Sequence, residues 1–179
     1  VVVNNATGST LTASRGTTFT TTVDGVSYSY LVKDDTTITP NDGVYTFSSL
    51  PVYEGTLINN KYTVDTTNAD QRFLIKNNLA DTTTLKVTVQ NSSSDSTTNT
   101  YTLATDLADI DSSSKVYYLE GAEDQQYEVK FGDGVLGAAL STGNIVTLSY
   151  IVTSAEESNG ASSFSLSGNI GGFSDVTIT

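Results

Sequence analysis

Apolar and polar residues alternate along most of the chain, most clearly in the stretch 127–152. Apolar side chains take every second position of 127–131 and again of 146–152. Because the side chains of a β-strand point alternately to its two faces, each run predicts a half-buried strand with one apolar face. Between the runs lies Gly132-Asp133-Gly134, whose glycines allow the positive φ angles of a turn. The pattern predicts a hairpin-like pair of strands joined by a loop that glycines shape.

Two Asp-Gly pairs predict further tight turns. Asp24-Gly25 separates two alternating runs and Asp42-Gly43 precedes another, and this dipeptide suits turns that need positive φ at both central residues. Asn59-Asn60 is a third expected turn, and the polar run 91–99 is expected to be a mobile hairpin tip. Short strands are expected at residues 1–3, 19–23, 26–32, 36–39, 44–47, 61–64, 72–76, 85–89, 100–103, 115–120, 164–166, 168–173 and 176–178.

Strong helix formers are sparse, and the chain has no long stripe with a period of 3.6 residues. Thr, Val, Tyr and Ile, which favour strands, are common. We therefore expect an all-β chain with at most one or two short helical turns, one of them at 106–111, and an antiparallel β-sandwich-like domain.

The chain carries 8 basic and 20 acidic side chains, which give a net charge of -12 and a sequence pI near 4.1. Binding to nucleic acid or to anionic lipid requires a Lys/Arg surface, so both partners are disfavoured. No apolar run approaches the roughly 18–20 residues of a membrane helix.

Cys, His, Met and Trp are absent. Disulfides, the zinc and haem sites that need Cys or His, and Ser-His-Asp or Cys-His catalysis are therefore excluded. The chain begins at Val1 without an initiator methionine or a signal segment, and we expect it to be a piece of a longer protein.

Three groups of residues have alternative chemical interpretations. Gly132-Asp133-Gly134 is either a metal or anion loop or a simple turn, and the turn is favoured. The paired acids Asp34/Asp35 and Glu156/Glu157 invite a glycosidase hypothesis, but adjacent strand residues point to opposite faces and no Trp platform exists. Five acids are either calcium ligands or a solvated acidic rim: Asp106, Asp109, Asp111, Glu123 and Asp124. Their spacing does not match a twelve-residue calcium loop, so the acidic rim is favoured.

Several short motifs occur in a fixed order along the chain: Arg15-Gly16-Thr17-Thr18-Phe19, Tyr53-Glu54-Gly55, the run YEVKFGDGVLG at 127–137, Gly143-Asn144, and 158–161. This ordered set resembles the baseplate wedge subunit of contractile-tailed bacteriophages, which is related to the baseplate J-like family. The motif residues, expected to be structural turns, are Arg15, Gly16, Thr17, Glu54, Gly55, Phe131, Gly132, Asp133, Gly134, Gly143, Asn144, Asn159 and Gly160.

The resemblance implies a structural protein of the virion tail baseplate, assembled in the host cytoplasm. Such subunits dimerise, bind neighbouring wedge subunits and join wedges into the ring around the tail hub. It implies no enzymatic activity, cofactor, nucleic-acid partner, membrane insertion or small-molecule substrate. The alternative is an extracellular carbohydrate- or receptor-binding β-sandwich module of the adhesin or surface-layer type, to which exposed tyrosines would contribute. A two-carboxylate enzyme is a third hypothesis.

The order of the motifs also predicts a domain organisation. Residues 1–65 and 155–179 would form an outer β unit, and 66–154 would be a β domain inserted into it. The polar runs 65–71 and 153–158 are the expected hinges. A simple split near residue 70 is the alternative.

Overall fold

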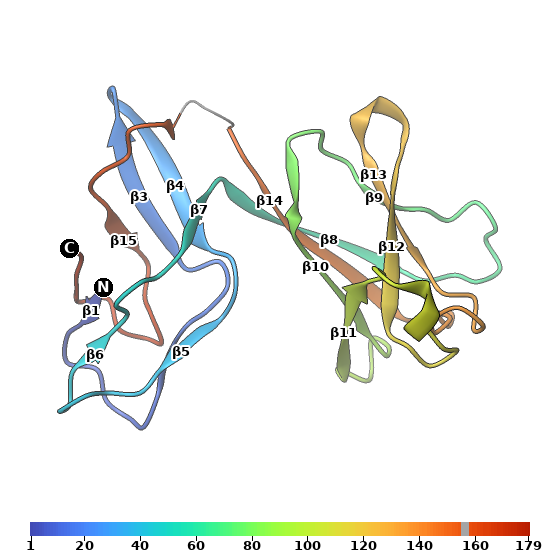
Figure 1. Ribbon diagram of the computed structural model, residues 1–179, viewed down its shortest axis with the longest axis horizontal. Helices are drawn as coiled ribbons and strands as arrows, with labels where there is room; N and C mark the ends of the chain where they lie inside the picture. Colours follow the sequence, from blue (N-terminus) through green and yellow to red (C-terminus); the bar gives the residue numbers. More distant parts are fainter. Residues whose placement is uncertain (155–157) are drawn as a thin grey trace. The chain divides into compact units, whose positions relative to one another are not determined.

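The computed structural model describes residues 1–154 and 158–179, which form two compact units (Figure 1). Unit 1 consists of Val1–Leu57 together with Thr153–Thr179, and unit 2 consists of Ile58–Val152. Both ends of the chain therefore belong to unit 1. The structural boundaries follow residues 57 and 152, whereas the sequence-based boundaries follow residues 65 and 154, so the polar run 65–71 lies inside unit 2.

The chain is nearly all-β, with 48% of residues in strands and 4% in helices, which confirms the expected fold class. The helical residues that the structure describes form two 3-10 turns, η1 (Leu107–Asp109) and η2 (Glu123–Gln125). The first turn is the one expected at 106–111. No helix in the described part of the chain is long and apolar enough to cross a membrane.

Unit 1 contains three small sheets, whose strand orders are β16-β1-β6, β15-β3-β4-β7 and β2-β5. Their strands are β1 (Val2–Val3), β2 (Leu11–Ala13), β3 (Thr18–Val23), β4 (Val26–Val32), β5 (Thr36–Ile38), β6 (Tyr45–Thr46), β7 (Val52–Glu54), β15 (Ser165–Ser167) and β16 (Val176–Thr177). The strands β1 and β3 thus pair with strands from the far end of the sequence.

The Asp24-Gly25 turn joins β3 to β4 as predicted, with φ of 50° and 82°. Because both angles are positive, the turn has the backbone that the Asp-Gly pair favours. Alternation then places Phe19 in the core of unit 1 beside Val32 and Phe47. Asp42-Gly43 forms the second predicted turn, with φ of 50° and 77°.

Unit 2 is built on one seven-stranded sheet with the order β8-β14-β10-β11-β12-β13-β9. From β14 across to β9, neighbouring strands are antiparallel, except that β11 and β12 are parallel. The strands are β8 (Thr56–Thr63), β9 (Phe73–Ile75), β10 (Ala80–Gln90), β11 (Thr98–Leu103), β12 (Val116–Gly121), β13 (Tyr127–Phe131) and β14 (Ile145–Val152). The expected hairpin through 91–99 connects β10 to β11.

The sheet of unit 2 is nearly closed, because its two edge strands approach each other. The Tyr62 hydroxyl on β8 donates to the Leu74 carbonyl on β9 over 2.6 Å. Edge-to-face ring contacts continue inward from Tyr62 to Phe73, from Phe73 to Phe131, and from Phe131 to Tyr101. Aromatic side chains from four strands therefore fill one end of the interior, and each such pair adds about 0.5–1.5 kcal/mol beyond the area it buries.

Three sequence-based expectations are wrong. Residues 168–173 are not a strand, because Gly171 and Gly172 form a turn that is closed by an isolated bridge between Ile170 and Phe173. Asn59-Asn60 is not a turn, because both residues lie inside the continuous strand β8, where Asn60 donates to the Tyr150 hydroxyl over 3.0 Å. The strands of 127–152 are not a hairpin-like pair either. Both backbone edges of β13 are occupied, by β12 and by β9, so β14 inserts instead between β8 and β10.

Candidate interaction surface

The first group of motif residues anchors the entry of β3 to β4. The Gly16 amide donates to the Val32 carbonyl, and the Val32 amide donates to the Thr17 carbonyl, each over 2.9 Å. Gly16 has φ of 88°, and a Cβ there would lie 3.0 Å from the Leu57 side chain, so only glycine fits without adjustment. The Arg15 guanidinium donates to the Lys33 carbonyl, and burial lowers its pKa while two neighbouring carboxylates oppose that effect.

Glu54 and Gly55 lie on the other edge of β4. Glu54 pairs with Tyr30 in the sheet, and its carboxylate accepts hydrogen bonds from the amide and the hydroxyl of Ser154. The Gly55 amide donates to the Ser29 carbonyl at φ of 133°. These contacts tie the exit of β7 to the segment that returns from unit 2.

The motif at 158–161 is held by the same strand. The Tyr30 hydroxyl donates to the carbonyl of the buried Ser158 over 3.1 Å, and the Tyr30 ring packs edge-to-face on Phe164. Asn159 and Gly160 follow as an exposed turn, in which Gly160 has φ of 97°. Three motif groups that lie far apart in the sequence therefore meet on β4.

In unit 2 the motif Phe131-Gly132-Asp133-Gly134 begins a tight loop. A Cβ on Gly132 would lie 2.2 Å from the Gly137 carbonyl carbon, a distance that no packed carbon tolerates. The Gly134 amide donates to the Gly137 carbonyl. The Asp133 carboxylate accepts hydrogen bonds from the amides of Val135 and Leu136, two and three residues further along the chain. These two amides hold the pKa of Asp133 below its usual range.

Gly143 and Asn144 close the far end of this connection. The Gly143 amide donates to the Val64 carbonyl, and the Val64 amide donates to the Asn144 carbonyl. The Asn144 side chain donates to the Asn91 carbonyl and accepts from the Ser141 amide. In unit 2 the motif residues from Gly132 to Gly134 and from Gly143 to Asn144 thus hold loop backbone in place, whereas Phe131 lies in β13 and packs its ring in the interior.

The glycine-rich loop lies against the loop that carries η1. The Gly137 amide donates to the Asp111 carbonyl over 3.0 Å, and the Ala138 amide donates to the Ser114 carbonyl over 2.8 Å. On the other side, the Tyr118 hydroxyl donates to the Leu136 carbonyl over 3.2 Å. The two loops are therefore one continuous, hydrogen-bonded surface at the end of β12 and β13.

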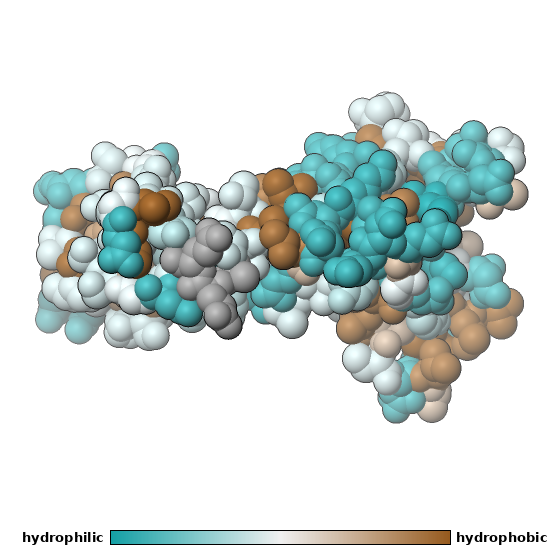
Figure 2. Space-filling model, turned by 90° about the horizontal axis from the view of Figure 1, so that it is seen from above, coloured by the Kyte–Doolittle hydropathy of each residue, from teal (hydrophilic) through white to brown (hydrophobic). Residues whose placement is uncertain are grey.

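This surface exposes large apolar side chains. Figure 2 shows hydrophobic side chains gathered on the lobe at the lower right of the view. Val135 is 71% exposed, although it follows a buried strand by only a few residues. We call the four exposed apolar residues of these loops and the adjoining strand end the apolar loop surface: Leu103, Leu107, Val135 and Leu136.

Carboxylates surround the apolar loop surface. Asp106 caps η1 through the Ala108 amide, and Asp111 accepts from both Ser113 and Ser114, hydrogen bonds that lower its pKa. Asp109 and Asp133 are also exposed, so four aspartates lie on these two loops. Within 104–115 and 132–144 the sole basic residue is Lys115.

The acids considered as alternative calcium ligands do not form a cluster. No group of three or more Asp or Glu residues in a metal-binding arrangement occurs among the described positions. Asp106, Asp109 and Asp111 lie before β12, whereas Glu123 and Asp124 lie in η2 after it. Of the paired acids, Asp35 accepts a hydrogen bond from the Arg15 amide, and Glu156/Glu157 lie outside the described residues.

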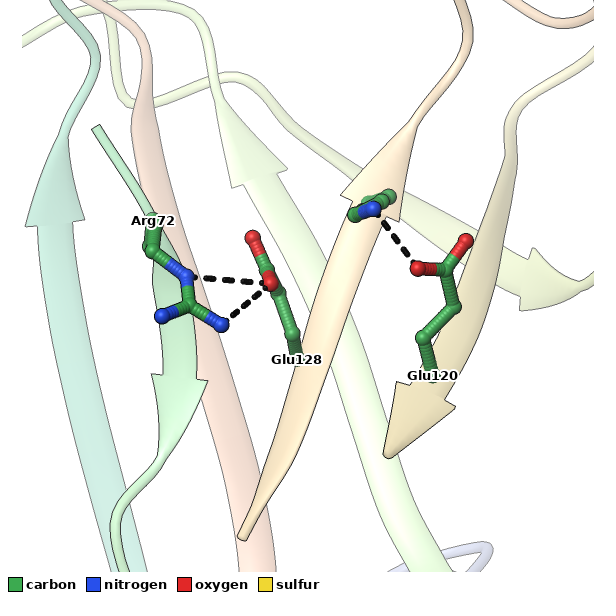
Figure 3. Close-up of polar contacts among 4 residues, drawn as sticks. Arg72, Glu120 and Glu128 are labelled. Atoms are coloured by element: carbon green, nitrogen blue, oxygen red, sulfur yellow. Dashed lines mark hydrogen bonds and ion pairs between the residues drawn. The ribbon is translucent and has the colours of Figure 1, made fainter. Parts of the chain in front are cut away.

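The outer face of β12, β13 and β9 carries ion pairs. Arg72 contacts Glu128 through two nitrogens, the closer at 2.8 Å, and Lys130 lies 2.6 Å from Glu120 (Figure 3). Because these cations are about half exposed, solvent screens the pairs, so they add little to stability and offer no unpaired charge to a ligand.

A second candidate site is a pocket of about 450 Å³ at the seam between β8 and β9. Its polar lining includes Asn60, the Tyr62 and Tyr150 hydroxyls, and the exposed Lys61 and Lys76. Burial raises the pKa of both tyrosines, so their hydroxyls stay neutral and can donate or accept. Neither lysine forms an ion pair with any residue that the structure describes.

Sequence reasoning missed the exposed apolar side chains and the seam pocket. The signal for the first was present: Val135 and Leu136 stand between glycines in G-D-G-V-L-G, where no strand alternation can bury them. The tyrosines differ in whether they could contact a partner. Tyr45 and Tyr117 are buried, whereas Tyr53 is exposed and has the Lys33 ammonium over its ring. No protein-family model matches the chain, and no curated protein matches it significantly.

Proposed function

We propose that the chain is a structural, non-enzymatic module of a phage tail baseplate that holds neighbouring wedge subunits through protein–protein contacts. One observation carries the proposal. The motif groups at 15–17, 54–55 and 158–160, through which the sequence resembles the wedge family, converge on β4.

Further features agree with a structural role. The motif residues form backbone hydrogen bonds and turns, and none of them points a reactive group into a pocket of the described chain. The proposed partners are a second copy in the parent protein and other wedge subunits, and the proposed location is the virion baseplate. Exposed loops and short strands supply specificity in such symmetric assemblies.

Immunogold electron microscopy tests this proposal. Antibodies raised against the chain should label the baseplate end of the tail in purified virions of the phage that encodes it. An antibody to a capsid protein serves as the positional control. Virions that carry no label on the tail, or purified chain that hydrolyses cell-wall glycan, would contradict the proposal.

The seam pocket favours one second candidate, a carbohydrate-binding module. Amide, hydroxyl and ammonium groups around one opening are the donors and acceptors that sugars use. A glycan array probed with the wild-type chain and with Lys61→Ala/Lys76→Ala tests it, with Lys86→Ala as a control outside the pocket. Binding that only the double variant loses would establish this candidate, and an array without signal would remove it.

A further inference from the structure

We propose that the apolar loop surface of unit 2 is a docking surface for another protein, whose contact region has an apolar centre and a rim of lysine or arginine. The inference rests on the proposed function, because it takes the partner to be a baseplate wedge subunit. It adds which face of this chain makes the contact and what chemistry the partner must present.

The loop is built to hold its apolar side chains in place. Gly132 and Gly137 touch backbone to backbone, where any larger residue would push the strands apart. Asp133 fixes the two amides of the tip, and Tyr118 fixes the Leu136 carbonyl. A preorganised surface loses little conformational freedom on binding, so its apolar contacts contribute more fully to affinity.

The exposed side chains lie outside the hydrophobic core of unit 2. Val135 and Leu107 are 71% and 60% exposed, and neither packs against the core cluster that contains Val129 and Tyr117. The Gly137 amide, two residues after Val135, joins the two loops at Asp111, four residues after Leu107, so both side chains project from one pair of packed loops. Clustered apolar exposure of this kind marks sites of protein contact.

The charges around the surface select the partner. Asp106, Asp109, Asp111 and Asp133 face solvent beside the apolar side chains, with Lys115 as the sole basic residue of the two loops. A second copy would bring the same carboxylates against these, and an anionic membrane would repel them in the same way. A protein with Lys or Arg around an apolar centre matches both the apolar area and the charge.

Biolayer interferometry with the purified chain tests the apolar centre. The probes are the wedge subunits encoded by the same phage, each purified singly. Val135→Ser/Leu136→Ser should weaken binding to one subunit by about 30-fold or more, because both aliphatic side chains lose their burial against the partner. Val26→Ser/Val44→Ser, which changes two valines of 52% and 48% exposure in unit 1, should leave binding unchanged.

The same instrument tests the charged rim. Asp109→Asn removes a carboxylate that accepts no hydrogen bond from any residue in the described part of the chain, and it should slow association by about 2–5-fold at low salt but not at roughly 1 M salt. Asp70→Asn, an exposed acid in another loop of unit 2, is the matched control and should have no effect.

The outcomes separate the inference from the proposed function. Loss of binding in the loop variant alone supports both. Equal binding by wild-type chain and loop variant overturns the docking surface and leaves the proposed function standing. Absence of binding to every wedge subunit overturns both. Sedimentation equilibrium that shows a wild-type dimer, and a monomer for the loop variant, replaces the basic partner with a second copy and overturns the inference.

Discussion

The closest backbone contact in unit 2 makes Gly132→Ala a sharp test of how the glycine-rich loop is held. An added Cβ would lie 2.2 Å from the Gly137 carbonyl carbon and 2.5 Å from its Cα. Both of these atoms belong to backbone, so no side-chain rotation can relieve the clash. The backbone segments around Gly132 and Gly137 must move apart instead.

The expected loss combines two effects. Overpacking a fitted contact costs about 1–3 kcal/mol. Separation also lengthens the hydrogen bonds from Gly134 to Gly137 and from Gly137 to Asp111, each of which contributes about 1 kcal/mol. We expect unit 2 to lose about 3 kcal/mol. For a domain of this size, that corresponds to a fall in Tm of about 12–24 °C.

Differential scanning calorimetry measures the change, and hydrogen exchange with mass spectrometry assigns it to peptides of unit 2. The matched control is Gly121→Ala at the end of β12, where a Cβ would meet nothing within 4 Å and φ is not positive. That variant should stay within about 0.5 kcal/mol of wild type. If Gly132→Ala melts at the same temperature as Gly121→Ala, the loop is not held by this contact.

Three further changes probe single hydrogen-bonded groups. Thr84→Val should destabilise unit 2 by about 1–3 kcal/mol in calorimetry, because the buried Thr84 hydroxyl accepts a hydrogen bond from the Ile151 amide over 2.9 Å. Thr84→Ser keeps the hydroxyl and should retain most of the wild-type stability. Equal melting temperatures of the two variants would refute the role of this hydrogen bond. Glu54→Ala should destabilise unit 1 by about 1 kcal/mol in urea unfolding, since the Ser154 amide loses its acceptor, and faster exchange confined to unit 2 would speak against it. The pKa of Asp133 in the folded chain lies below its ordinary value of 3.8, so the stabilisation by this carboxylate is complete above pH 3.8 and is lost as the pH falls through the lower folded value. The urea midpoint of Asp133→Asn should therefore change less with acid than the midpoint of wild type. Parallel plots of the two midpoints against pH would contradict this.

Local patterns in the sequence predicted the elements well, because alternation and turn chemistry act between near neighbours. Asp24-Gly25 predicted the β3–β4 hairpin, and alternation in 127–131 and 146–152 predicted two strands where the structure has β13 and β14. The helical turn at 107–109 was also foreseeable, since Asp106 is a good capping residue.

Pairing partners were not predictable from the same patterns. Alternation states which face of a strand is buried, but not which neighbour occupies each edge. The strand β14 is buried at both Tyr150 and Ile151, which point to opposite faces, and this marks a central strand rather than half of a hairpin. Asn59-Asn60 failed for a related reason, because the distant Tyr150 hydroxyl satisfies Asn60 within a strand.

The candidate interaction surface was likewise only partly predictable from the sequence. Glycines with forced backbone angles could be singled out because few other residues adopt such angles. The exposure of Val135 could be read from its place between glycines, but the packing of its loop against the loop of Leu107 runs through Gly137 and Asp111, and no local pattern encodes that packing.

The discontinuous make-up of unit 1 has a consequence for synthesis of the chain. Its strands β1 and β3 leave the ribosome early, yet their partners β16 and β15 come from residues 176–177 and 165–167. At about 5–20 residues per second, Phe19 waits roughly 7–30 s for Leu166, whereas unit 2 is continuous and can fold during that time. The part made first is therefore completed last, and its apolar strands are open to chaperones and proteases until then.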